Sequence, residues 1–184
     1  MQELRELLKD KIENELAIFL KSYDFELIIS EHEYSSTHDV FKFKKDDLFI
    51  DIDHFGFHPH DYPWSICPML GRQGFKKSTQ QFDSIALWYF KQKIAPRESW
   101  QRDVIKLTFD NYPINSKEQI TKAVSQCIFD LENFCKDYLT NDFYLFDKIR
   151  EINYLEYLVQ TQVFGEYHWT GKKKFTIYKN KELE

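Results

Sequence analysis

Apolar and polar residues alternate along residues 40–64, the stretch around which the chain is organised. Phe41 and Phe43 alternate with lysines, and Ile50 and Ile52 alternate with aspartates after a short charged segment. A period of two places successive side chains on opposite faces of a strand. The stretch therefore predicts the central hairpin of an antiparallel sheet, with these four apolar residues in the core.

The register of this hairpin can be predicted by pairing apolar residues with apolar residues. A slip by one residue would place phenylalanines opposite aspartates, so burial disfavours it. We expect Asp51 to be exposed and to form ion pairs with lysines across the strands. Asp51 and Asp53 could instead be a carboxylate pair for acid–base chemistry, but spacing alone favours a solvated charged face. The predicted pairs, across a turn of Lys45 and Asp46, are Lys44 with Asp47, Phe43 with Leu48 and Phe41 with Ile50.

Helical periodicity marks the N-terminal segment and residues 117–160. Residues 2–23 form the first predicted helix, and residues 117–160 form a helical pair that begins after a capping sequence at Asn115 and Ser116. The short connection at 140–142 predicts that the two helices of the pair pack antiparallel. The apolar stripes are Leu4, Leu8, Ile12, Leu16, Phe19 and Tyr23 in the first helix and Ile120, Val124, Cys127, Leu131, Cys135 and Tyr138 in the second.

The remaining segments complete an α+β fold. Pro68 predicts that its strand lies at an edge or contains a bulge. Residues 82–94 fit a helix or a buried strand, which a short apolar run cannot separate, and we take the helix. Further strands are predicted at 25–34, 64–70, 103–109 and from Gln162 onward, where 167–169 and 175–177 form a last hairpin. Gly71–Gly74 ends the 64–70 strand, and 75–81 is predicted to be an exposed loop. The whole predicts a single domain over residues 1–184, an antiparallel sheet of about four to six strands with an N-terminal helix and a C-terminal helical pair packed on it.

Composition narrows the classes of partner. Seventeen phenylalanines, eleven tyrosines and four tryptophans predict an aromatic core, with some rings left on the surface for contacts. The formal net charge of −5 makes nucleic acid an unlikely partner, because nucleic-acid binders carry a basic face. Five lysines within residues 172–181 form a local basic run, which we interpret as a solvated hairpin.

The cysteines and the apolar runs indicate a cytoplasmic protein. Cys67, Cys127 and Cys135 are odd in number and show no CxxC spacing, so we expect all three to be reduced. On one helix Cys127 and Cys135 would lie ~12 Å apart, too far for a disulfide. The longest apolar run, 85–90, is too short to span a bilayer, and the N-terminus carries no apolar signal core.

One polar loop could carry chemistry, since the glycine-rich, P-loop, HExxH and GxSxG motifs are absent. We call residues 54–64 the histidine loop. His58 and His60, with His54 or Asp61 as the third ligand, could bind zinc or another divalent metal and support metal-dependent hydrolysis. A nucleophilic Cys67 activated by His58 or His60 is disfavoured by its apolar strand.

The second interpretation is that the histidine loop binds another protein. His58, His60, Asp61, Tyr62 and Trp64 combine titratable groups, a carboxylate and two amphipathic rings within seven positions. Aromatic anchors rimmed by charge are typical of protein interfaces. The sequence therefore favours a non-enzymatic protein-binding module, of the inhibitor or immunity-like kind and with no expected cofactor, over a metal-dependent hydrolase.

Overall fold

The computed structural model describes residues 2–32, 38–55, 63–74, 83–94 and 112–164, with the backbone alone at 29–32, 38–40, 53–55 and 155–164. A six-stranded antiparallel sheet forms its centre, in the order β1-β2-β3-β4-β5, with β6 paired to β4. The strands are β1 (Glu26–His32), β2 (His38–Lys45), β3 (Leu48–Phe55), β4 (Ser65–Arg72), β5 (Ser84–Ala86) and β6 (Tyr112–Pro113).

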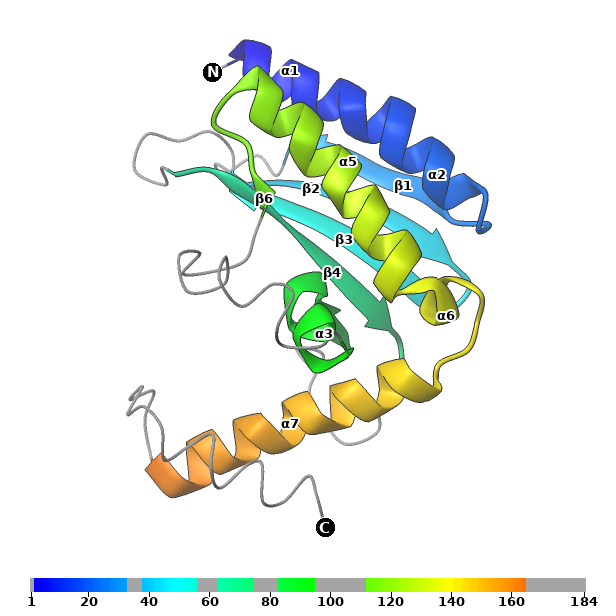
Figure 1. Cartoon of the computed structure of the whole chain (residues 1–184), viewed down its shortest axis with the longest axis vertical. Coiled ribbons are helices and arrows are strands. Elements are labelled where there is room, and N and C mark those ends of the chain that lie inside the picture. The colour runs from blue at the N-terminus through cyan, green and yellow to red at the C-terminus, as the bar shows by residue number, and fades with distance from the viewer. Residues whose placement is uncertain (1, 33–37, 56–62, 75–82, 95–111, 165–184) are drawn as a thin grey trace.

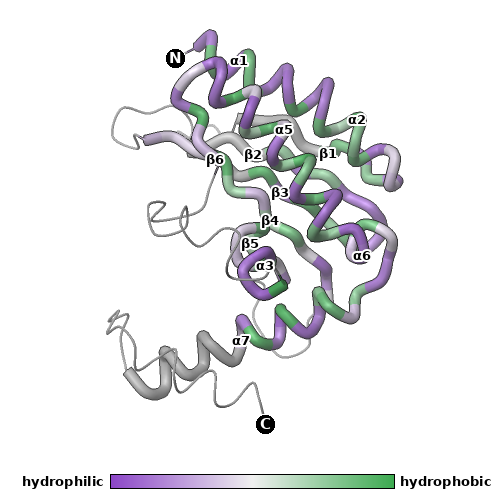
Figure 2. Tube along the Cα trace, in the orientation of Figure 1, coloured by the Kyte–Doolittle hydropathy of each residue, from purple (hydrophilic) through white to green (hydrophobic). Residues whose placement is uncertain are grey.

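Helices cover one face of this sheet (Figure 1). The helices are α1 (Gln2–Lys11), a π-helical segment η1 (Ile12–Leu16), α2 (Ala17–Lys21), α3 (Leu87–Ile94), α5 (Lys117–Phe134), α6 (Lys136–Leu139) and α7 (Tyr144–Phe164), of which α7 lies beside the sheet instead of over its face. Apolar positions recur along α1 and α5 and alternate with polar positions along the central strands (Figure 2). The buried side chains form one cluster between the helices and the sheet. The predicted α+β fold is thereby confirmed.

The central hairpin has the predicted faces in a different register. Phe43 pairs with Ile50 and Phe41 with Ile52, so the strands are offset by two residues from the predicted pairing. Asp46 and Asp47 form the turn, because Asp46 adopts a φ of 51° that two-residue hairpins require and aspartate tolerates. An even offset keeps every side chain on its predicted face. All four predicted core residues are therefore buried.

Asp51 is more buried than the sequence predicted. Its side chain is 17% exposed and lies 3.4 Å from the ammonium group of Lys42. These two residues are cross-strand partners in the observed register, which explains both the ion pair and the shielding from solvent. The expected cross-strand ion pair is present, but the expectation of an exposed Asp51 is wrong.

The N-terminal helix contains a π-helical segment whose position follows from the apolar spacing. Leu8, Ile12, Leu16 and Leu20 are all fully buried, at intervals of four residues. Such a repeat exceeds the 3.6 residues of an α-helical turn, so the stripe would drift around a regular helix. The wider turn of η1 brings the stripe back toward the sheet.

Pro68 lies in a strand that is paired on both sides. β4 pairs continuously with β3 through Pro68, without a bulge. On its other side β4 pairs with β5 only at 69–71 and with β6 only at 65–66. Within the described residues Pro68 thus faces a gap between two short strands, where its missing N–H costs no ladder bond. The prediction that Pro68 lies in an edge strand or at a bulge is therefore wrong; Pro68 lies in a paired strand, at a local gap in the pairing on one side.

Residues 82–94 contain both of the elements that the sequence left open. Ser84–Ala86 form β5, and Leu87 begins α3. Ile85 on the strand and Leu87 and Phe90 on the helix are buried. Each element is short, so neither periodicity could develop over the window that pattern reading needs.

The C-terminal helices follow the predicted stripe but not the predicted packing. All six stripe residues of the 117–139 segment are buried. α7 packs against α6, α3 and β5 and turns away from α5, instead of lying antiparallel along it (Figure 1). Asn141, with a φ of 68°, redirects the chain, and Phe146 then packs on Tyr138 with ring centroids 4.9 Å apart.

Two boundaries also differ from prediction. Residues 162–164 continue α7 instead of starting a strand, and β4 extends through Gly71 to Arg72 instead of ending at Leu70. The extension is possible because the ring of Phe49, the cross-strand partner of Gly71, covers the position of the missing side chain. The predicted turn at 35–37, loop at 75–81, strand at 103–109 and hairpin at 167–177 lie outside the described residues.

Candidate functional site

The sheet has two ends that carry different groups of polar residues. We call the end where β3 stops at Phe55 and β4 starts at Ser65 the loop end. β6 and the start of α5 lie at this same end, because β6 pairs with the first residues of β4. The opposite hairpin end holds the β2–β3 turn and the last residues of β4.

The histidine loop leaves and re-enters the sheet at the loop end. His54, its first residue, belongs to β3 and pairs with Asp39 and Ile66. His58, His60, Asp61 and Tyr62 lie outside the described residues, so their predicted binding role and the predicted metal set with His54 remain predictions. In the part of the chain that is described, no three His, Cys, Asp or Glu side chains are grouped to hold a metal ion.

Both backbone polar groups of Trp64, the last residue of the histidine loop, are hydrogen-bonded. Its N–H donates to Oδ1 of Asn115 over 2.6 Å, and its carbonyl accepts from the N–H of Ile114 over 3.0 Å. The Trp64 side chain is partly exposed and also packs against the core. The loop is thus attached at its C-terminal end to the segment that leads into α5.

Hydrogen bonds at the start of α5 hold the residue to which Trp64 is attached. Ser116 is the N-cap, and its Oγ accepts from the N–H of Gln119 over 3.2 Å. Gln119 Oε1 in turn accepts from the backbone N–H of Asn115 at 2.8 Å and from Nδ2 of Asn115 at 3.1 Å. The predicted capping sequence is confirmed, with Gln119 as the reciprocal partner. The two bonds from Asn115 to Gln119 Oε1 therefore orient the Asn115 amide toward Trp64.

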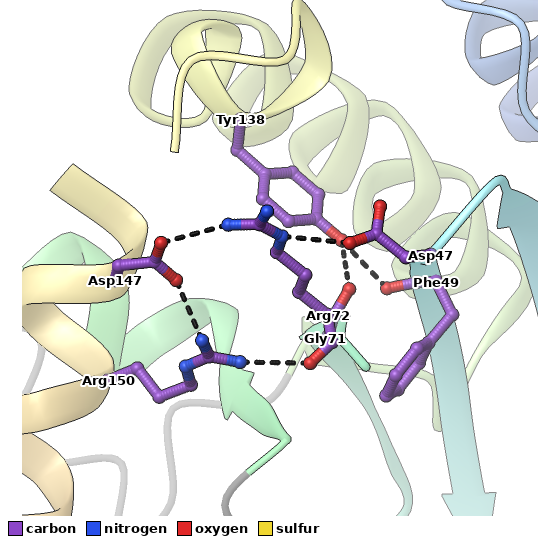
Figure 3. Close-up of polar contacts among 7 residues, drawn as sticks. All are labelled: Asp47, Phe49, Gly71, Arg72, Tyr138, Asp147 and Arg150. Atoms are coloured by element: carbon purple, nitrogen blue, oxygen red, sulfur yellow. Dashed lines mark hydrogen bonds and ion pairs between the residues drawn. The ribbon is translucent and has the colours of Figure 1, made fainter. Parts of the chain in front are cut away.

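At the hairpin end, two arginines and two aspartates form a connected network (Figure 3). Arg72 bridges Asp47 at 3.0 Å and Asp147 at 2.9 Å, and its guanidinium lies over the ring of Phe143. Arg150 donates to Asp147 at 2.8 Å and to the carbonyl of Arg72 at 2.9 Å. This network ties α7 to the β2–β3 turn and to the end of β4.

Tyr138 lies at the centre of the same end. Its hydroxyl is 2.7 Å from the carbonyl of Gly71 and 2.9 Å from that of Phe49, which are cross-strand partners (Figure 3). Burial raises the pKa of the Tyr138 hydroxyl, so it stays protonated and shares its hydrogen between the two carbonyls. Its chemistry is therefore that of a structural donor.

A second buried network surrounds Asp130 on α5. One carboxylate oxygen accepts from Lys91 at 2.7 Å and from the hydroxyl of Tyr112 at 2.6 Å, and the other accepts from Gln126 at 3.0 Å. Burial raises the pKa of Tyr112, and the charge of Asp130 raises it further. Asp130 itself is fully buried and joins α3, β6 and α5 through its partners.

These networks were missed by sequence reasoning, although Asp130 left a signal. It lies three residues after Cys127 and directly before Leu131, so it faces the apolar side of the helix. An acid at such a position needs a buried partner. Arg72 left no comparable signal, because it was assigned to a glycine-rich break.

All three cysteines are free thiols. Cys67 is partly exposed, with its sulfur 3.8 Å from that of Met69, whereas Cys127 and Cys135 are buried. Burial raises the pKa of both buried thiols, and the charge of Asp130 raises the pKa of each further. A histidine partner for Cys67 would come from residues 58 or 60, which are outside the described residues.

Thiol labelling should therefore separate Cys67 from the other two cysteines. At about pH 8 a disulfide reagent should modify one thiol per native chain rapidly and three after unfolding, because only a partly exposed thiolate reacts. The Cys67→Ser variant should lose the rapid phase. A reaction rate for native Cys127 or Cys135 equal to that of Cys67 would contradict the burial of these two thiols.

No protein-family model, curated protein or solved structure matches the chain. Within the described ranges, no helix combines the length and the apolar character needed to cross a bilayer. The function must therefore be inferred from the chain's own residues.

Proposed function

We propose that this chain is a non-enzymatic protein-binding module, of the inhibitor or immunity-like kind, and that the histidine loop is its contact surface. The observation that carries the proposal is the double backbone attachment of Trp64 to Ile114 and Asn115. Loops that are held at both ends by a rigid scaffold can present side chains to a partner at small ordering cost. Here β3 holds one end and the start of α5 holds the other.

The polar networks favour binding over catalysis. The carboxylates of Asp130 and Asp147 are each held by cations from other turns or elements of the fold. Tyr112 and Tyr138 have raised pKa values and donate to fixed acceptors. These groups hold elements together, and we therefore assign contact with a partner to the aromatic and titratable residues of the histidine loop.

The partner we propose carries a basic surface. The chain has a formal net charge of −5, and opposite charge on a partner accelerates encounter. Association should therefore slow as ionic strength rises, while the dissociation rate, set by the aromatic contacts, should change less.

Site-specific crosslinking tests the proposal. A photoreactive benzoylphenylalanine in place of Trp64 should crosslink a defined protein in the native host. The matched control is the same group at Tyr144, a 75% exposed aromatic position on α7, near the hairpin end. With the partner purified, Trp64→Ala should weaken Kd by about 30-fold while circular dichroism stays unchanged. Identical crosslinks from both positions, or an unchanged Kd, would overturn the proposal.

Metal analysis tests the alternative function. Protein purified without a histidine tag should contain far less than one zinc per chain if the histidine loop serves binding alone. Recovery of about one ion per chain, lost in a His58→Ala, His60→Ala variant, would favour the metal-dependent hydrolase instead.

A further inference from the structure

We propose that Asn115 is the positioning residue of Trp64, the last residue of the histidine loop: its side-chain amide links the Trp64 backbone to the fixed start of α5. This inference rests on the proposed function, because it assigns a role within the same contact surface. Asn115 is distant from Trp64 in sequence and is brought to it by the pairing of β6 with β4.

The geometry of the Asn115 amide is determined by its partners. Nδ2 donates to Gln119 Oε1, which leaves Oδ1 as the acceptor for the N–H of Trp64. The backbone N–H of Asn115 donates to the same Gln119 oxygen. Both ends of the side chain are thus engaged, and its rotation is restricted.

Loss of this amide should affect position more than folding. Without Oδ1, Trp64 would keep one backbone bond, from the N–H of Ile114. The neighbouring pairs of β4 with β6, at Ser65 and Ile66, do not involve Asn115. The sheet should therefore persist while Trp64 and the end of the loop gain freedom, which raises the entropy that binding must remove.

Three variants separate positioning from stability. Asn115→Ala removes the acceptor. Asn115→Asp keeps an acceptor oxygen within reach of Trp64 and is the conservative rescue. Ser116→Ala removes the N-cap of the same helix, which lowers stability without removing a contact of Trp64, and is the matched control.

Two measurements are made on each variant in the full-length chain. The first is hydrogen exchange of the Trp64 amide by NMR, which needs no partner. The second is Kd for the protein crosslinked from position 64. Asn115→Ala should accelerate exchange of this amide by about tenfold relative to neighbouring β4 amides and weaken Kd by about five- to tenfold. Asn115→Asp keeps the acceptor for Trp64 but loses the donor to Gln119 Oε1, so it should restore both in part. Ser116→Ala should leave Kd within about twofold.

The outcomes distinguish this inference from the proposed function. A Trp64 amide that stays protected in Asn115→Ala, or a Kd loss equal to that of Ser116→Ala, overturns the positioning role. If Trp64→Ala weakens Kd and Asn115→Ala does not, only the positioning role fails. If neither substitution changes Kd, the histidine loop is not the contact surface and the proposed function fails.

Discussion

Replacing Asp130 with alanine is expected to lower the free energy of unfolding by about 3 kcal/mol. The substitution leaves the ammonium group of Lys91 without its carboxylate, and the buried hydroxyl of Tyr112 loses its acceptor. The value lies at the lower end of the range for broken buried ion pairs, because the Lys91 side chain is 23% exposed and can regain some water. Urea unfolding followed by circular dichroism measures the change.

A double-mutant cycle provides the control for Asp130. Adding Lys91→Met to Asp130→Ala removes the unpaired charge, so the double variant should be more stable than the sum of the single losses predicts. If the two single losses in the free energy of unfolding simply add, or if Asp130→Ala costs less than about 1 kcal/mol, the ion pair is solvated in the native protein.

Replacing Phe43 with alanine is expected to cost about 3–5 kcal/mol. Phe43 is fully buried at the centre of the sheet, opposite Ile50, and its removal leaves a cavity beneath the helices. The loss is comparable to the whole stability of a marginal domain, so the variant should unfold near or below physiological temperature. Thermal unfolding and urea midpoints measure it.

Lys44 is the matched control for Phe43. It is the next residue on β2 and is exposed on the opposite face, so Lys44→Ala should change stability by no more than about 0.5 kcal/mol. A Phe43→Ala loss as small as that of Lys44→Ala would mean that the two faces of β2 are inverted.

Sequence reasoning predicted the faces of the strands and helices because burial imposes a simple periodicity. It could not choose between registers that differ by two residues, since both keep Phe41 and Phe43 in the core. The choice depends on which residues form the turn, and the conformation of Asp46 decides it. The local conformation of the turn thus determines the register of the hairpin, which the hydrophobic pattern left open.

Long-range polar pairing was beyond the reach of the sequence. Lys91 and Asp130 are 39 residues apart, and Arg72 and Asp147 are 75 apart. The local sequence around each of these residues does not indicate which distant residue it pairs with. The direction of α7 depends on the same distant contacts, which is why a short connection was insufficient to predict it. For the candidate site, sequence alone supplied the composition of the histidine loop, whereas the structure supplied the attachment of Trp64.

The double contact of the Tyr138 hydroxyl has a consequence for folding kinetics. Tyr138 joins carbonyls that lie 89 and 67 residues earlier in the chain, so its contacts contribute strongly to contact order. The β2–β3 hairpin can form locally on the microsecond scale. The hydrogen bonds of Tyr138 to β3 and β4 can form only after α5 and α6 have docked on the sheet. We therefore expect Tyr138→Phe to act mainly on the unfolding limb of a chevron plot, as a contact that is completed after the transition state.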